Sequence, residues 1–159
     1  MVEKILWFGG FVIVLAASRI IPHPPNFTPI LAVAIFAPTI IKDTKIVIVA
    51  TLLAMFIADL YWGLHSFMLW TYSCIALSTL LAKHIKLWTM SILSPVMFFV
   101  ITNFAVWTSG YYGYTIQGLV NCYVAAIPFF SMTLLSTMLY TGLFFIIYKL
   151  TNNFLYKNI

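Results

Sequence analysis

Long apolar segments separated by short gaps constrain this chain more than any other feature of its sequence. Hydrophobic residues make up 64% of its 159 residues and charged residues only 7%, whereas a soluble domain carries about 25% charged residues. Only helices and closed barrels satisfy every backbone group in lipid, and these apolar runs lack the alternation of barrel strands. We therefore expect one all-α domain that is embedded in a membrane.

Breaks at proline, glycine and charged residues divide the chain into six apolar segments, which we expect to be the transmembrane helices of one compact bundle. The last apolar region is too long for one span, and Pro128, which removes a helical hydrogen bond, is expected to divide it. The part before Pro128 is expected to form a separate short helix over the outer face, at residues 115–126. The expected spans are residues 5–21, 27–41, 46–62, 67–82, 87–107 and 128–150.

The positions of the charges indicate an orientation in the membrane. Six spans place both termini on one side; every lysine falls on that side, and Arg19 alone falls on the other. Positively charged loops stay in the cytoplasm, so both termini are expected there. The lysines are dispersed at segment ends, so the net charge of +5 does not indicate a nucleic-acid partner.

Arg19 and Asp59 lie near those ends of their apolar segments that are expected on the outer side of the membrane. Ionisable residues are rare in membrane helices and usually face a partner or a water-filled cavity. Two hypotheses stay open with equal weight: a structural ion pair that ties the first helix to the third, or contacts to a ligand. The other candidate ligand-binding residues are polar or aromatic and share the outer side; they are His23, Asn26, Trp62, His65, Asn103, Trp107, Tyr111 and Gln117.

Anchoring at the lipid headgroups is the simpler interpretation of each histidine, tryptophan and tyrosine taken singly. A second pattern is the stripe of Ala50, Ala54 and Ala58, which recur every four residues. Small residues let another backbone approach closely. The stripe is a candidate docking surface for a partner subunit, although packing inside the chain is favoured.

Groups for catalysis and metal binding are scarce. Glu3, Asp43 and Asp59 are the only carboxylates, and no histidines have the spacing of a metal site. Cys74 and Cys122 lie in apolar runs and are expected to be buried free thiols. We expect no enzyme activity, no metal and no cofactor, and the absence of a P-loop means that any active transport needs an external motor.

Four stretches, residues 18–30, 58–65, 102–107 and 121–130, resemble a family of small bacterial membrane proteins grouped with transporters but without an assigned function. That family in turn resembles the substrate-binding S components of energy-coupling factor vitamin transporters, which are six-helix proteins. The resemblance implies a protein of the bacterial inner membrane that captures a vitamin-like micronutrient under its outer loops. It also implies a partner, an energising module of a membrane subunit and two ATPases.

One departure from S components concerns that module, because they commonly carry spaced alanines on the first helix, where this chain has the adjacent pair Ala16 and Ala17. The leading hypothesis is a small-molecule uptake protein in which Arg19 meets a carboxylate or phosphate. Asp59 then holds Arg19 or accepts a ligand N–H, and the aromatic side chains sandwich a ring. The rival hypothesis is a structural or assembly subunit of a membrane complex that transports nothing.

Overall fold

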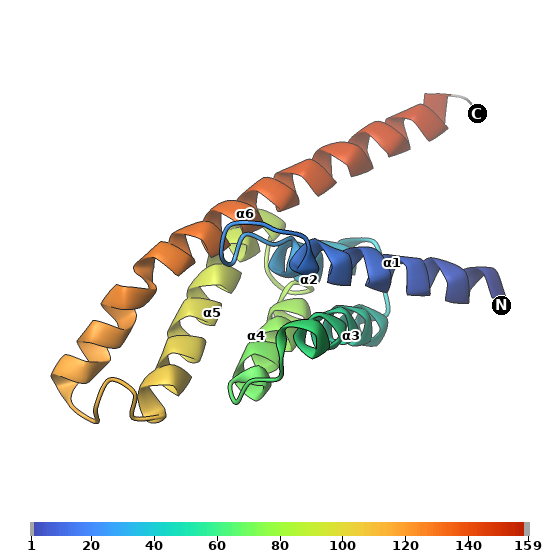
Figure 1. The fold of residues 1–159 in the computed structure, drawn as a ribbon. Coiled ribbons are helices and arrows are strands. Elements are labelled where there is room, and N and C mark those ends of the chain that lie inside the picture. The colour runs from blue at the N-terminus through green and yellow to red at the C-terminus, as the bar shows by residue number, and fades with distance from the viewer. Residues whose placement is uncertain (1, 158–159) are drawn as a thin grey trace.

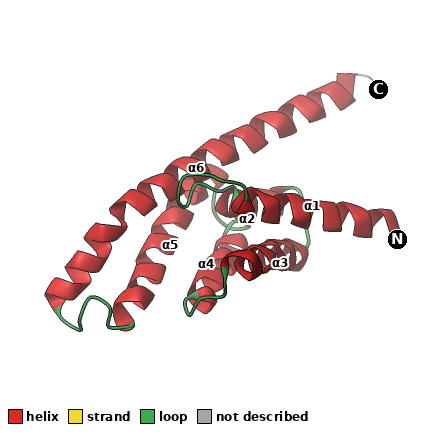
Figure 2. Cartoon of the chain, viewed as in Figure 1, coloured by secondary structure: helices red, strands yellow, loops and turns green. Residues whose placement is uncertain are grey.

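The chain consists of helices and loops throughout the part that the computed structural model describes, which is the backbone of residues 2–157 and the side chains of residues 8–151 (Figure 2). The elements in chain order are α1 (Val2–Ile20), α2 (Ile30–Phe36), the 3₁₀-helix η1 (Ala37–Thr39), α3 (Thr44–Trp62), α4 (Met68–Leu81), α5 (Leu87–Thr108) and α6 (Ile116–Lys157).

Three helices of the described part are long and apolar enough to cross a membrane: α3, α5 and the part of α6 over Ile116–Thr151. Shorter apolar helical segments are Phe8–Ile20, Ile30–Thr39 and Met68–Leu81. The bounds of α1, α3, α4 and α5 lie within three residues of the segments expected from the hydropathy pattern. The fold is therefore all-α, and its long helices have the make-up of a membrane protein.

The short helix α2 lies at the centre of the arrangement (Figure 1). It packs against α3, α4, α5 and α6, while α1 packs along α3 and α5 packs along α6. All seven residues of α2 are buried, with exposed fractions between 0% and 8%. A helix that is apolar on every side is stable only when other elements surround it, and here the other helices do so.

The expected span at residues 27–41 is wrong in its length, because α2 covers only Ile30–Phe36. Asn26 has a positive φ of 62°, so the chain is still turning just before the helix. Pro38 has no backbone N–H and cannot donate the next helical hydrogen bond, and the chain continues after Phe36 as the 3₁₀ turn of η1. Seven residues give a helix of about 10 Å, which is a third of the hydrocarbon thickness of a bilayer.

The expected separate helix at residues 115–126 is also wrong, because α6 continues through Pro128 as one helix of 42 residues. Figure 1 shows one unbroken ribbon that changes direction along its length. Pro128 cannot donate a hydrogen bond to the Val124 carbonyl. Helices in apolar surroundings tolerate such a loss, since any non-helical break there would expose more backbone groups.

The stripe of Ala50, Ala54 and Ala58 is covered within the chain, with exposed fractions of 2%, 0% and 0%. The first two belong to the same buried cluster as Leu15 and Ala16 of α1. Their small side chains let α1 and α3 approach closely. The alternative that the stripe is a docking surface for a partner subunit is therefore wrong, and its role is internal packing.

Candidate functional site

An ion pair joins the C-terminal ends of α1 and α3. Arg19 lies in the last turn of α1, and its Nη2 atom is 3.4 Å from Oδ1 of Asp59 in α3. The Asp59 side chain is 4% exposed and that of Arg19 is 25% exposed. The close packing of α1 on the alanine face of α3 brings these two turns together. The structural ion pair, one of the two hypotheses for these residues, is thus present.

Two further side chains surround the Asp59 carboxylate. Tyr72 of α4 donates its hydroxyl to Oδ2 at 2.7 Å, and Nε2 of His65 lies 3.9 Å from the same oxygen. Asp59 therefore links α1, α3 and α4. The sequence patterns did not single out Tyr72, because a tyrosine within an apolar helix carries no charge or spacing signal.

Two ring nitrogens lie within hydrogen-bond distance of the Arg19 carbonyl at the end of α1. Trp62 donates Nε1–H to it at 3.2 Å, and Nε2 of His23 lies 3.2 Å from it. The other ring nitrogen of His23, Nδ1, is 2.8 Å from the Pro24 carbonyl. The last carbonyls of a helix have no partner within the helix. His23 therefore fixes the proline-rich loop between α1 and α2 (residues 21–29) to α1, and Trp62 fixes the end of α3 to it. Arg19, His23, Asp59, Trp62 and His65 therefore form one cluster.

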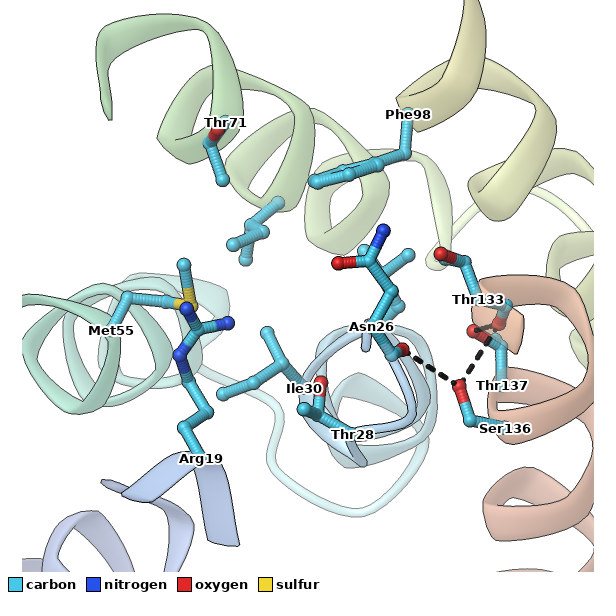
Figure 3. Close-up of a pocket in the computed structure, with 12 residues that line it drawn as sticks. Arg19, Asn26, Thr28, Ile30, Met55, Thr71, Phe98, Thr133, Ser136 and Thr137 are labelled. Carbon is cyan, nitrogen blue, oxygen red and sulfur yellow. Dashed lines mark hydrogen bonds between the residues drawn. The ribbon is translucent and has the colours of Figure 1, made fainter. Parts of the chain in front are cut away.

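A small cavity opens beside this cluster, and we call it the central cavity (Figure 3). Its volume is about 40 Å³, which is room for about three water molecules. Arg19 enters from α1, Asn26 and Thr28 come from the loop, and Phe98 of α5 lies across the cavity from Arg19. The remaining lining residues are Ile30, Leu31, Met55, Thr71, Ile75, Thr133, Ser136 and Thr137.

Two neighbouring cavities share residues with the central cavity. The loop pocket, of about 230 Å³, is lined by Arg19, Asn26 and Trp62 together with Ile21, Pro22, His23 and Thr28. A third cavity of about 140 Å³ lies between α5 and α6, where Asn103 and Asn26 are among its lining residues. Asn26 lines all three cavities, so its left-handed backbone turn holds the side chain at their junction.

Three of the expected site residues lie away from these cavities. Trp107 packs on Phe104, Tyr111 is 83% exposed, and Gln117 donates to Asn121 within α6. None of the three lines the central cavity, the loop pocket or the third cavity. The loop between α5 and α6 projects away from the end of α1 (Figure 1), so the expectation of one pocket that includes these residues is wrong.

The hydroxyl groups of α6 were missed by the sequence patterns, although their spacing was a usable signal. Thr133, Thr137 and Thr141 recur every four residues and are 7%, 0% and 0% exposed. Residues four apart lie on one face of a helix, so an apolar helix with hydroxyls at this spacing has one polar face. Of these threonines, Thr133 and Thr137 line the central cavity.

Taken together, the long apolar helices, and the partly buried ion pair beside a cavity with polar lining residues, define an all-α protein that has the composition of a membrane protein. Its candidate site lies among the ends of its helices. The chain belongs to a family of unknown function, DUF6580, which matches residues 1–158. No curated protein and no solved structure matches the chain. Among the described residues, no three His, Cys, Asp or Glu side chains lie together where they could hold a metal ion.

Proposed function

We propose that this chain is a membrane uptake protein that binds a small solute in the central cavity, beside Arg19. One observation carries the proposal: a guanidinium group with unused donors lines a polar cavity between apolar helices. Arg19 gives one hydrogen bond to Asp59 at 3.4 Å, and its buried Nε atom has no partner. Ionisable groups among membrane helices usually mark substrate paths or binding sites.

The proposal includes six crossings of a bacterial inner membrane, with Arg19 facing the outside and both termini in the cytoplasm. Lys42 and Lys45 are then cytoplasmic if the chain crosses at α2. The length of α2 is compatible with this crossing, because α2 is buried in protein. Irregular backbone at membrane depth is tolerated where protein or a cavity surrounds it.

The size of the cavities favours a solute smaller than most vitamins. Pockets for drug-sized ligands have volumes of about 300–1,000 Å³, whereas the central cavity has about 40 Å³ and the adjoining loop pocket about 230 Å³. A vitamin-like ligand would have to occupy both. The resemblance to S components supports an energising module as partner, but the buried alanine stripe of α3 is not where that module would dock.

The test is purification in mild detergent followed by mass spectrometry of the small molecules that accompany the protein. The wild type is compared with Arg19→Met, which removes the cation, and with Lys83→Met, which removes an exposed cation from the turn after α4. We expect a solute with the wild type and with Lys83→Met, and none with Arg19→Met. The same solutes in all three preparations, or none with the wild type, would show that the proposal is wrong.

A second candidate function, that of a structural or assembly subunit, is favoured by an apolar groove of about 410 Å³ between α1, η1 and α6. Phe11, Phe36 and Phe144 line it, together with Val33, Ala37, Ile40, Ile41, Ile147, Tyr148 and Thr151. Figure 1 shows α1 and α6 diverging towards their free ends. Purification with a stoichiometric partner protein and without a solute would favour this function over uptake.

A further inference from the structure

The hydrogen-bonding capacity of the central cavity differs between its two sides. On the α1 side, the Arg19 guanidinium offers five N–H donors and no acceptor. Asp59 takes one of these donors at 3.4 Å, and Nε–H is buried without a partner. Asp59 itself already accepts from Tyr72 at 2.7 Å. The unused capacity on this side therefore belongs to donors that carry a positive charge.

On the α6 side, the hydroxyl protons are already used. Thr133 donates to the Phe129 carbonyl at 2.9 Å, and Thr137 donates to the Thr133 carbonyl at 2.7 Å. Ser136 donates to the Thr133 carbonyl at 3.1 Å and lies 3.4 Å from the Asn26 carbonyl. A hydroxyl has one donor and two acceptor lone pairs. The unused capacity on this side therefore belongs to acceptors.

The two sides face the same small space. Figure 3 shows Arg19 at one edge of the central cavity and Thr133, Ser136 and Thr137 at the other, with Asn26 between them. The cavity of about 40 Å³ admits a group of only a few atoms, while the adjoining loop pocket also contains Arg19. An anionic group at Arg19 would thus sit where the two spaces meet, with a short arm reaching towards α6.

We infer that the solute is a short carboxylate that bears a hydroxyl or amino group, and that Thr137 on α6 selects it by accepting a hydrogen bond from that group. The inference rests on the proposed function and assigns a specificity role to a residue that carries no charge. A site that is built to hydrogen-bond a substrate group discriminates strongly against the analogue that lacks it, because the buried partner is then left unpaired.

The test measures the binding of four probes to the purified full-length protein in detergent by isothermal titration. Lactate and alanine carry both groups, propionate lacks the donor, and lactamide lacks the negative charge. We expect lactate or alanine to bind at least about tenfold more tightly than propionate, the size of one hydrogen bond. Lactamide is expected not to bind, and Arg19→Met is expected to lose the binding of the three carboxylates.

Two variants of α6 separate the role of the hydroxyl from that of packing. Thr137→Val keeps the shape and is expected to reduce the ratio of the propionate and lactate dissociation constants to about one, whereas Thr137→Ser is expected to keep the ratio high. Thr141→Val is the matched control, because Thr141 is buried on the same face but does not line the cavity. Thermal unfolding of each variant verifies that it is folded.

Each outcome is decisive for the inference. Equal binding of lactate and propionate that Arg19→Met abolishes would overturn the selection by α6 and leave the proposed function intact. No binding of any probe would overturn the inference of a short carboxylate, while the mass spectrometry above tests the proposed function independently. Unchanged discrimination in Thr137→Val would show that the selecting group lies elsewhere.

Discussion

The ion pair between Arg19 and Asp59 makes a quantitative prediction about stability. Arg19→Met keeps the apolar part of the side chain and removes the charge, which leaves a carboxylate that is 4% exposed with Tyr72 as its hydrogen-bond donor. Asp59→Asn removes the negative charge and keeps an acceptor for Tyr72. The double variant removes both charges, so the three proteins and the wild type form a double-mutant cycle.

The magnitude follows from the geometry. At 3.4 Å and an effective dielectric constant of about 20, the Coulomb attraction is about 5 kcal/mol. Removal of both ions from water offsets a large part of this gain, and the quarter-exposed Arg19 side chain is partly screened by solvent. We therefore expect a coupling energy of about 2 kcal/mol, within the range measured for residues in direct contact.

The assay is the free energy of unfolding in mixed micelles titrated with sodium dodecyl sulfate, followed by circular dichroism. We expect each single substitution to lower this free energy and the double variant to be more stable than the sum of the two effects predicts. If the effects add to within about 0.5 kcal/mol, as for independent sites, the two charges are not coupled. The cluster at the ends of α1 and α3 would then need another explanation.

Three further predictions test the contacts between helices and the capping of α3, by thermal or chemical unfolding in detergent. Ala54→Leu places a large side chain where α1 contacts α3, at a residue that is 0% exposed, and is expected to lower the free energy of unfolding by about 1–3 kcal/mol. Unchanged stability would show that the alanine stripe is not packed against α1. Asp43→Ala removes the side-chain acceptor of the Lys45 N–H at the start of α3 and is expected to cost about 1 kcal/mol, whereas Asp43→Asn should retain most of the stability. Ser94→Ala removes a hydrogen bond of 2.7 Å from α5 to Ser78 of α4 and is expected to cost about 1 kcal/mol, with Ser109→Ala at an exposed loop position as the control.

The features that the sequence predicted best are those whose misplacement would cost the most free energy, namely the charged residues and the apolar segments. Charges are expensive in apolar surroundings, so the isolated Arg19 and Asp59 indicated a common site, and the structure places them 3.4 Å apart. The hydropathy pattern located α1, α3, α4 and α5 for the same reason. Asn26 was a candidate because it is polar and falls on the expected outer side of the membrane, and it lies at the junction of all three cavities.

Hydropathy could not predict what covers an apolar segment. Residues 27–41 are as apolar as a span, but protein rather than lipid surrounds the helix α2 that forms there. A proline in an apolar helix is equally ambiguous, since Pro128 lies inside α6 rather than at its start. The contact of Tyr72 with Asp59 depends on how α4 packs on α3, and no local pattern encodes that packing.

The burial of α2 has a consequence for how the chain is built into a membrane. An independent membrane helix needs about 20 apolar residues, so a helix of seven residues cannot be inserted and held in lipid by its own hydrophobicity. It must enter together with the segments around it, and α6, which is synthesised after α2, completes its cover. The central helix α2 therefore stays incompletely covered until α6, which follows it in the chain, packs against it.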